Sequence, residues 1–432
     1  MRKQPHSTEE KEETAVVVKA IFREDRDLRD PFAEIVALAR TAGVRVVGKI
    51  PQRIERPNAA TYLGHGKITE AAESAKQLDV DTLIADNDLS PAQERNIEKL
   101  SERKVVDRSQ IIMDIFARRA RTRQSKLQVE LAQLRYNLPR LKRMWSHLSR
   151  HDGGIGMRGP GETQLETDKR LVRKRIQRLE RDLEEIQARN EELQAKRSQD
   201  FVISLVGYTN SGKSTLLNRL TGADALVEDK LFATLDSRVR RWTVAPRRVV
   251  LLGDTVGFIR DLPHHLVASF QSTLSDARFA DLLLHVVDAS SPNVEAEIAT
   301  VQQVLKEIDC GGKSTWVLLN KWDAVPEERR VEAQVLGTRF APGTPVFCVS
   351  AVSGTGLDAV AAAVDEHLHA RSVQLEARIP HSRGDLAAYL RKNGKVLREE
   401  FNEEGVLLVA ELTPARAAKF RALWPDARPL SR

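Results

Sequence analysis

Eight residues near the middle of the chain have the types and spacing of a phosphate-binding loop. They are Gly207, Tyr208, Thr209, Asn210, Ser211, Gly212, Lys213 and Ser214, which match G-x-x-x-x-G-K-[ST]. The loop follows a strand-like run, 201–206, and precedes a helical run, 215–220. Glycine allows main-chain N–H groups to close around phosphates. We expect Lys213 to contact the β- and γ-phosphates and Ser214 to bind Mg²⁺.

A second motif, Asn320-Lys321-Trp322-Asp323, ends a later strand-like run, 315–319. The Asp323 carboxylate can accept two hydrogen bonds, from guanine N1–H and N2–H₂. Adenine lacks this pair of donors, so the motif predicts selection of GTP over ATP. Ser350-Ala351 follows another strand and can supply a main-chain N–H to guanine O6.

A third motif, Asp254-Thr255-Val256-Gly257, follows the strand-like run 249–252. Asp254 is placed to hold the magnesium shell through water, and the Gly257 N–H is placed to contact the γ-phosphate. Many GTPases have Gln at the next position to orient the attacking water, but here it is Phe258. Because a phenyl ring cannot hydrogen-bond water, the catalytic polar group must come from elsewhere or from a partner.

In this order and at these spacings, the motifs lie at carboxyl ends of strands, where ligands bind in such sheets. The set resembles that of translation-factor-class GTPases. The resemblance implies that Thr234 is the switch I threonine that completes the Mg²⁺ shell and acts in catalysis with Lys213 and Gly257. Asn210 resembles an asparagine that ligates K⁺ in some GTPases, and a turn asparagine is the open alternative. Other expected nucleotide contacts in switch I are Phe232, Ala233, Leu235 and Asp236.

The runs around these motifs alternate strands with helices and predict an α/β fold, a doubly wound sheet of six strands over residues 200–371. Residues 15–110 predict a smaller α/β domain with a largely parallel sheet. We expect residues 1–14 to be disordered and residues 372–432 to form an α+β appendage. The appendage is predicted to contain helices at 383–391 and 414–423 and a strand at 404–411.

Residues 111–199 carry two heptad stripes, which predict a helical hairpin packed as a short antiparallel coiled coil. Pro139 should interrupt the first helix, and Asn190 occupies a seam position that can fix register. Thr163 and Glu166 predict a capping box for the second helix. The stripes are Leu131, Leu134, Leu138, Leu141, Trp145 and Leu148, then Ile176, Leu179, Leu183, Ile186, Asn190 and Leu193.

The hairpin region is strongly basic. Residues 118–199 hold 21 basic and 11 acidic residues, a net charge of +10, whereas the whole chain carries +7. Such clustering predicts a polyanionic partner, with a solvated helix face as the open alternative. Between the helices, residues 150–161 form a glycine-rich loop in which Arg150 and Arg158 can bind phosphate. Its glycines are Gly153, Gly154, Gly156, Gly159 and Gly161.

The segments 153–168 and Thr61-Tyr-Leu-Gly-His-Gly-Lys67 closely resemble signatures of the HflX family. This resemblance covers nearly the whole chain. It implies a ribosome-associated GTPase that binds the large ribosomal subunit, and some members split stalled or hibernating ribosomes under stress. The segment at residues 64–67 also raises a second nucleotide site, but it lacks the first glycine of a phosphate loop. A turn before a helix at residues 67–77 is the favoured interpretation.

Composition limits the remaining classes. Cys310 and Cys348 are too few for a disulfide framework or a four-cysteine zinc site. No apolar run is long enough to cross a bilayer, and residues 1–10 do not form a signal peptide. We therefore expect a cytoplasmic protein, peripheral at most to a membrane, with RNA rather than DNA as its partner. A large-subunit assembly or anti-association factor and an ATP-dependent RNA remodeller remain the alternatives.

Overall fold

The structure is a computed structural model of the 432-residue chain, and it divides into two compact units. The first unit comprises Met1–Glu184, Asp229–Leu235 and Asp261–Phe270, and the second comprises Glu185–Glu228, Asp236–Arg260 and Gln271–Arg432. The structure describes residues 13–23, 30–141, 160–197, 200–223, 231–232, 234–235, 238–246, 248–260, 277–340 and 343–430. Most of the terminus expected to be disordered, residues 1–12, lies outside these ranges, and residues 13–14 belong to the first strand.

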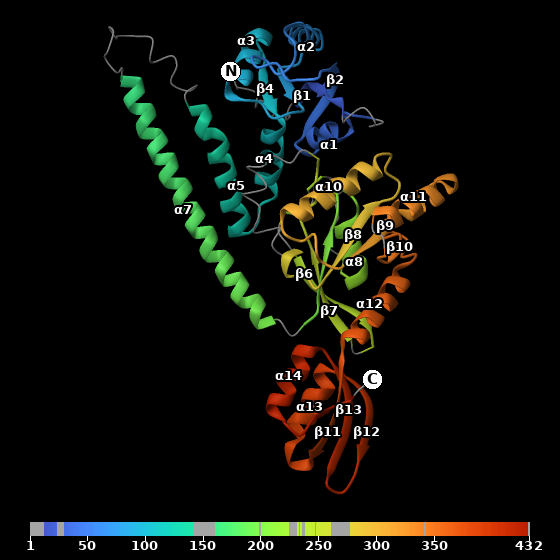
Figure 1. The fold of residues 1–432 in the computed structure, drawn as a ribbon. Coiled ribbons are helices and arrows are strands. Elements are labelled where there is room, and N and C mark those ends of the chain that lie inside the picture. Colours follow the sequence, from blue (N-terminus) through green and yellow to red (C-terminus); the bar gives the residue numbers. More distant parts are fainter. Residues whose placement is uncertain are drawn as a thin grey trace, which may run out of the picture. The chain divides into compact units, whose positions relative to one another are not determined.

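The first unit is built on a four-stranded parallel sheet of order β2-β1-β3-β4 (Figure 1). The predicted parallel sheet is therefore confirmed. Both faces of the central strand β1 are covered, which is why its residues from Ala15 to Val18 are all buried. The elements are β1 (Glu13–Ile21), α1 (Ala33–Thr41), β2 (Val44–Arg53), α2 (His65–Gln77), β3 (Thr82–Ala85), α3 (Pro91–Ser101), β4 (Lys104–Asp107) and α4 (Arg108–Arg119).

The segment raised as a second nucleotide site, residues 64–67, forms the N-cap and first turn of α2, so the helix begins two residues earlier than the predicted start at residue 67. The N–H of Gly64, the residue before the helix, donates to Gln52 Oε1 at 2.8 Å. The Lys67 ammonium lies 2.6 Å from Glu70 Oε2. These groups are engaged within the chain, so the contacts give no support to a phosphate loop here.

A helical hairpin follows the parallel sheet. As Pro139 predicts, the first helix ends early, and a 3-10 turn follows it. Leu131 and Leu179, from the two heptad stripes, are 3% and 0% exposed. Ion pairs Arg135–Glu180 and Arg175–Glu130 also join the two helices. The elements are α5 (Arg123–Asn137), η2 (Leu138–Arg140) and α7 (Pro160–Arg197).

Two details of the predicted hairpin are wrong. Helix α7 begins at Pro160, so Thr163 lies within the helix and cannot be its N-cap. Proline suits a first helical turn, because its missing N–H would have no intrahelical partner there. Asn190 is exposed and does not occupy a buried seam. The other glycine-rich loop residues, 150–159, lie outside the described residues, while Gly161 belongs to α7.

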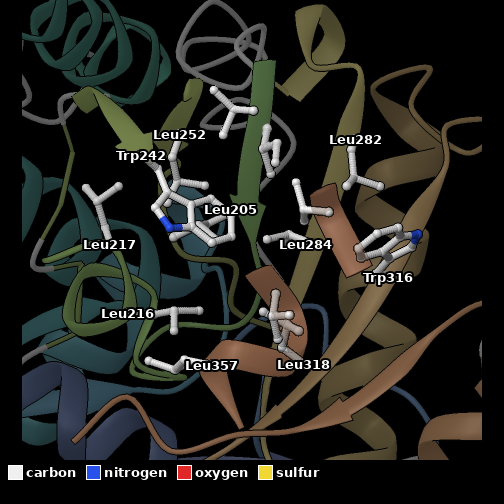
Figure 2. Packing of buried hydrophobic residues seen from close by; sticks show 14 of the residues in the cluster. Leu205, Leu216, Leu217, Trp242, Leu252, Leu282, Leu284, Trp316, Leu318 and Leu357 are labelled. Atoms are coloured by element: carbon white, nitrogen blue, oxygen red, sulfur yellow. The ribbon is translucent and has the colours of Figure 1, made fainter. Parts of the chain in front are cut away.

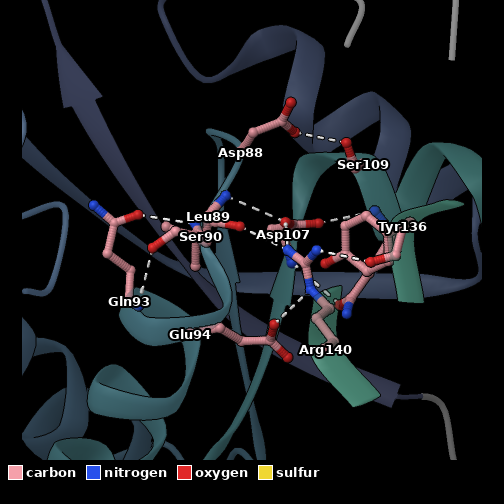
Figure 3. Close-up of polar contacts among 10 residues, drawn as sticks. Asp88, Leu89, Ser90, Gln93, Glu94, Asp107, Ser109, Tyr136 and Arg140 are labelled. Carbon is pink, nitrogen blue, oxygen red and sulfur yellow. Dashed lines mark hydrogen bonds and ion pairs between the residues drawn. The ribbon is translucent and has the colours of Figure 1, made fainter. Parts of the chain in front are cut away.

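Arg140 attaches the first hairpin helix to the parallel sheet (Figure 3). Its guanidinium donates to Glu94 Oε2 at 3.0 Å and to the Leu89 carbonyl at 2.6 Å. A longer contact of 3.5 Å reaches Asp107 Oδ2. The guanidinium carbon also lies 3.5 Å from the centre of the Tyr136 ring, a cation–π geometry. We call this group of residues the Arg140 joint.

Asp107 is the buried centre of the Arg140 joint, with 1% of its surface exposed. Its carboxylate accepts hydrogen bonds from the N–H groups of Gln110, at 2.9 Å, and Leu89, at 3.2 Å. Burial raises the pKa of Asp107 to about 6, although these hydrogen bonds oppose the change. Strand β4, helix α4 and the hairpin thus meet at one carboxylate.

The second unit contains the predicted six-stranded sheet, of order β10-β9-β8-β5-β7-β6. All neighbours are parallel except β6 and β7, which form an antiparallel pair. Figure 2 shows leucines and Trp242 and Trp316 packed in its core. The elements are β5 (Val202–Val206), α8 (Lys213–Thr221), β6 (Arg238–Ala245), β7 (Arg248–Asp254), β8 (Leu282–Asp288), α10 (Val294–Glu307), β9 (Thr315–Asn320), η3 (Trp322–Ala324), α11 (Glu327–Phe340), β10 (Val346–Cys348) and α12 (Leu357–Arg371).

The second unit ends in an antiparallel sheet of order β12-β13-β11-β14 with two helices. The two helices and one strand predicted here are confirmed. The prediction missed the other three strands, β11, β12 and β14. For β11 the signal was present, because Leu375, Ala377 and Ile379 are buried at alternate positions, the pattern of a half-buried strand. The elements are β11 (Val373–Pro380), η4 (His381–Arg383), α13 (Gly384–Asn393), β12 (Lys395–Phe401), β13 (Gly405–Leu412), α14 (Pro414–Leu423) and β14 (Arg428–Pro429).

Ion pairs connect this terminal sheet to the starts of two central strands. Arg248, the first residue of β7, contacts Glu411 Oε2 at 2.6 Å and Asp365 Oδ1 at 2.7 Å. Arg416 pairs with Asp200, which lies just before β5. Glu411 is 3% exposed, so its buried negative charge needs the ion pair with Arg248.

We predict that Glu411→Ala destabilises β13 by about 3 kcal/mol, because Arg248 would keep a largely buried charge with one carboxylate fewer. Hydrogen exchange of β13 peptides in increasing urea measures this locally, without assuming that the chain unfolds in one step. The control is Arg339→Ala, which breaks an exposed pair with Glu295 and should cost under about 1 kcal/mol. Equal effects of the two variants would contradict the assignment.

Candidate functional site

The predicted phosphate loop lies between β5 and α8, at the carboxyl end of a central strand. Gly212 has a φ of 93°, a backbone conformation that residues other than glycine rarely adopt. A Cβ at Gly212 would lie 2.3 Å from Asn320 Nδ2, and one at Gly207 would lie 2.2 Å from the Val286 carbonyl oxygen. Both positions therefore require glycine, as the motif predicts.

Lys213 is the first residue of α8, and its side chain is buried beneath the loop. Its ammonium donates to the carbonyls of Gly207, at 3.0 Å, and Tyr208, at 2.8 Å. Burial lowers the pKa of Lys213 to about 8, and the nearby charge of Asp254 opposes this change. The site therefore holds a desolvated cation, whose charged form a phosphate group would stabilise.

Ser214 and Asp254 meet beside the loop. The Ser214 hydroxyl donates to Asp254 Oδ2 at 2.6 Å, and Asp254 is the last residue of β7. Hydroxyl and carboxylate oxygens are ligands that Mg²⁺ prefers. By contrast, the Thr255 hydroxyl donates to the Leu205 carbonyl at 2.7 Å, and Val256 is buried. The side chains of Thr255 and Val256 thus support the fold, although nucleotide contacts were predicted for both residues.

Residues 254–260, called here the switch II start, are hydrogen-bonded to the phosphate loop. Phe258 donates its N–H to the Gly207 carbonyl at 3.1 Å and accepts from the Thr209 N–H at 2.7 Å. The Phe258 side chain is 2% exposed. A Cβ at Gly257 would lie 2.7 Å from Thr209 Cγ2, so the two segments touch closely. Phe258 is therefore an anchor in the core.

The guanine motif is joined to the phosphate loop by Asn320. Its amide nitrogen donates to the Ser211 carbonyl at 2.8 Å, and its Oδ1 accepts from the Ala351 N–H at 3.0 Å. Lys321 has a left-handed φ of 59° and pairs with Asp288 at 2.7 Å. Asp323 lies exposed in η3, as a residue that binds a base requires.

The structure brings Ser350 and Ala351 to this site but engages their N–H groups within the chain. Ser350 donates its N–H to the Thr355 carbonyl at 3.0 Å, and Ala351 donates to Asn320 as above. A contact of Ala351 with guanine O6 would have to share or replace that bond. The contact therefore stays a prediction.

Four residues of the predicted switch I, 231–232 and 234–235, are described, and they belong to the first unit. Phe232 is buried with a left-handed φ of 54°, and its ring meets that of Phe116 edge-on at 4.6 Å. The Leu231 N–H donates to Thr41 Oγ1 at 3.3 Å. Ala233 and Asp236 lie outside the described residues. The magnesium contact of Thr234 and the nucleotide contact of Leu235 stay predictions.

Sequence reasoning missed three neighbours of the site. His285 on β8 is 2% exposed, and burial, followed by the charge of Lys213, lowers its pKa to about 4, so it is neutral. Asp288 ends the same strand and holds Lys321. Arg260 donates its N–H to the Tyr208 hydroxyl at 2.9 Å. The polar ends of the run 285–288 could have signalled the first two, but the third depends on tertiary contact.

Comparison with protein families gives three matches along the chain. A model described as "GTP-binding GTPase N-terminal" matches residues 29–117, and "GTP-binding GTPase Middle Region" matches residues 119–197. The model "50S ribosome-binding GTPase" matches residues 202–321. A solved structure, of SsGBP in complex with GDP, is 27% identical with a TM-score of 0.48, and the match covers 82% of this chain and 98% of that one.

Relatives match nearly the full length of the chain. GTPase HflX of Escherichia coli strain K12 is 43% identical over 397 residues, which cover 91% of this chain and 92% of the relative. GTPase HflX of Lacrimispora saccharolytica is 42% identical over 401 residues, with 92% and 93% covered. The chain belongs to the HflX family of GTPases. As an HflX-family GTPase, it binds GTP and hydrolyses it to GDP. In the described part of the chain, no helix has the length and apolar character needed to span a membrane.

We predict that nucleotide affinity falls above pH 8. The free protein loses the Lys213 proton there, since its pKa is about 8, whereas bound phosphate favours the charged form. Calorimetry of GDP binding at pH 8.5, in two buffers of different ionisation enthalpy, should show uptake of more than half a proton per GDP. Lys213→Arg, which stays charged, is the control and should take up almost none. Proton uptake near zero in the unaltered protein would contradict the burial argument.

We predict that Asp323→Asn weakens GTP selectively, because the amide nitrogen cannot accept from guanine N1–H or N2–H₂. The phosphate cradle should remain intact, since Asp323 lies exposed outside it. Competition between GTP and xanthosine triphosphate measures the change in preference. Glu327→Gln, on the neighbouring exposed helix start, serves as the control for charge alone. Full guanine selectivity in Asp323→Asn would show that the motif is wrongly assigned.

Proposed function

We infer that this HflX-family GTPase is a switch that binds the large ribosomal subunit and splits stalled or hibernating ribosomes under stress. The observation that carries the inference is a stripe of exposed cations on α7, described below. The family model matched by residues 202–321 is described as a 50S ribosome-binding GTPase, which supports the same partner.

The exposed cations of α7 are spaced so that they share one face of the helix. Intervals of three and four residues return to the same face, so the cations form a stripe. The apolar heptad positions Ile176, Leu179 and Leu183 fall on the opposite face, toward α5. The members of this basic stripe are Arg170, Arg173, Lys174, Arg178 and Arg181.

The helix that carries the basic stripe is attached to α5 and, through α5, to the N-terminal sheet. Pairs Arg135–Glu180 and Arg175–Glu130 join α7 to α5, and the Arg140 joint attaches the end of α5 to the N-terminal sheet. Phosphate contacts fix the position and orientation of a protein on RNA, so a held stripe suits docking. We propose that the glycine-rich loop, with Arg150 and Arg158, also contacts ribosomal RNA.

The nucleotide site binds its phosphates through the loop and Lys213. Among the described residues, the buried hydroxyls of Thr209 and Ser211 have no hydrogen-bond partner, and phosphate oxygens would supply acceptors. Ser214 would ligate Mg²⁺ with Thr234, and Asp254 would hold it through water; the ion neutralises phosphate charge. Asn210 has a left-handed φ of 61°, which suits a turn, and we propose it also as a K⁺ ligand.

Hydrolysis in the isolated protein should be slow. Phe258 is buried and cannot orient water, so this chain lacks the usual water-orienting glutamine. An oriented water and a stabilised phosphate charge supply most of the catalysis in this reaction class. Docking on the large subunit restores both by ordering switch I around Thr234. The subunit is then the activator of the enzyme.

The test is GTP-dependent sedimentation with intact ribosomes, together with single-turnover hydrolysis with and without large subunits. We predict free subunits in the GTP state and faster hydrolysis with large subunits. Binding to large subunits without splitting would favour an assembly or anti-association factor. Splitting that required ATP would favour an ATP-dependent remodeller. Fast hydrolysis that large subunits leave unchanged would remove the activation model.

Charge reversal tests the basic stripe. Substituting Arg170, Lys174 and Arg178 with Glu should weaken large-subunit binding roughly tenfold or more and flatten its salt dependence, because fewer counterions are released. Intrinsic hydrolysis should not change. The matched control reverses three exposed cations of the C-terminal sheet domain, Lys392, Lys419 and Arg421. Equal loss in both triple variants would mean that overall charge, and not the stripe, governs binding.

A further inference from the structure

The junction between the phosphate loop and the switch II start is made by three hydrogen bonds. Two join main-chain groups: Phe258 N–H to the Gly207 carbonyl at 3.1 Å, and Thr209 N–H to the Phe258 carbonyl at 2.7 Å. The third joins the Arg260 N–H to the Tyr208 hydroxyl at 2.9 Å. The two segments therefore run side by side as a short parallel bridge, with one side chain closing its far end.

Tyr208 is built into this junction. It is 8% exposed, and its main-chain carbonyl accepts a hydrogen bond from the Lys213 ammonium at 2.8 Å. Its hydroxyl reaches past Phe258 to Arg260. One residue thus contacts both the cation expected at the γ-phosphate and the segment that follows Gly257.

Gly257 lies inside the junction and has little room to move. A Cβ there would be 2.9 Å from Thr209 Cα and 3.2 Å from Lys213 Nζ. On one side of Gly257, the Thr255 hydroxyl holds the Leu205 carbonyl at 2.7 Å. On the other side, Phe258 and Arg260 are hydrogen-bonded to the loop. The Tyr208 bond therefore restricts the segment on the side that leads into the rest of switch II.

We propose that Tyr208 is the positioning residue that holds the switch II start so that the Gly257 N–H faces the γ-phosphate of GTP. The phosphate loop itself, through a tyrosine hydroxyl, orders the γ-phosphate sensor before nucleotide arrives. Because the sensor is already ordered, the protein loses less conformational freedom when GTP binds. GDP has no γ-phosphate, so its affinity does not depend on this ordering.

The proposal explains why an apolar residue can follow the Asp-x-x-Gly motif. The side chain of Phe258 packs in the core, and its main chain is hydrogen-bonded to the phosphate loop. The ordering of the segment is then divided between that bridge and Tyr208, and no side chain of residue 258 is needed near the phosphates. The specificity for a triphosphate over a diphosphate lies in the junction.

The test is Tyr208→Phe, which removes one oxygen atom and keeps the ring. The affinity for a non-hydrolysable GTP analogue should fall about three- to tenfold, the range expected for one lost hydrogen bond. The affinity for GDP should stay the same, which also reports an intact phosphate loop. Tyr389→Phe, which removes the hydroxyl of a tyrosine in the C-terminal sheet domain, is the matched control and should change neither affinity.

Three outcomes would overturn the role of Tyr208: no change in either affinity, an equal loss of both, or tighter binding of the GTP analogue. The proposal rests on the predicted contact of Gly257 with the γ-phosphate, and Gly257→Ala tests that contact separately. If Gly257→Ala lowers GTP-analogue affinity more than GDP affinity while Tyr208→Phe does not, the Tyr208 proposal alone fails. If Gly257→Ala has no such preference, the assignment of the γ-phosphate sensor fails as well.

Discussion

The buried ammonium of Lys213 is the constraint on which the nucleotide site depends. A cation taken out of water needs compensating dipoles and charges, and here it has two loop carbonyls and the field of Asp254. The loop must curl tightly to present those carbonyls, which requires glycine at its ends. The strands must end at one edge to bring Asp254 near, which parallel order ensures. His285 is kept neutral by its own burial and, to a smaller extent, by the same charge. The site is thus organised around one desolvated positive charge, which a bound phosphate would stabilise.

Sequence reasoning recovered what local pattern determines. The phosphate loop, the six strands and the helix break at Pro139 follow from glycine spacing, apolar runs and a missing N–H, and the structure has all three. It failed where the partner is distant in the chain. The burial of Phe232 against Phe116 leaves no periodic trace in sequence. Asn190 fits the heptad count, but a heptad predicts a seam only as far as the partner helix extends, and there the side chain is exposed.

Arginine has two separate physical roles in this chain. Arg108, Arg140 and Arg248 are largely buried and paired with carboxylates, so they hold elements together and contribute little to the outer field. The arginines of the basic stripe on α7 are exposed, where their long-range field is available to a partner. Composition counts both groups alike. The net charge of the hairpin region therefore counts Arg140, which holds the hairpin to the sheet, together with the exposed cations of the basic stripe.

Asn320 makes two side-chain hydrogen bonds, one to the Ser211 carbonyl and one from the Ala351 N–H, and they constrain how such a site can evolve. This side chain links the phosphate loop to the segment predicted to bind guanine, and it also fills the space that a Cβ at Gly212 would need. Asp323 is exposed, and its predicted contact with guanine implies that a substitution there would change the preferred base and leave the phosphate loop intact. A substitution of Asn320 would instead be expected to lower the affinity for every nucleotide. The predicted roles therefore imply different selection at the two ends of this four-residue motif: at Asp323 for the identity of the base, and at Asn320 for the structure of the whole site.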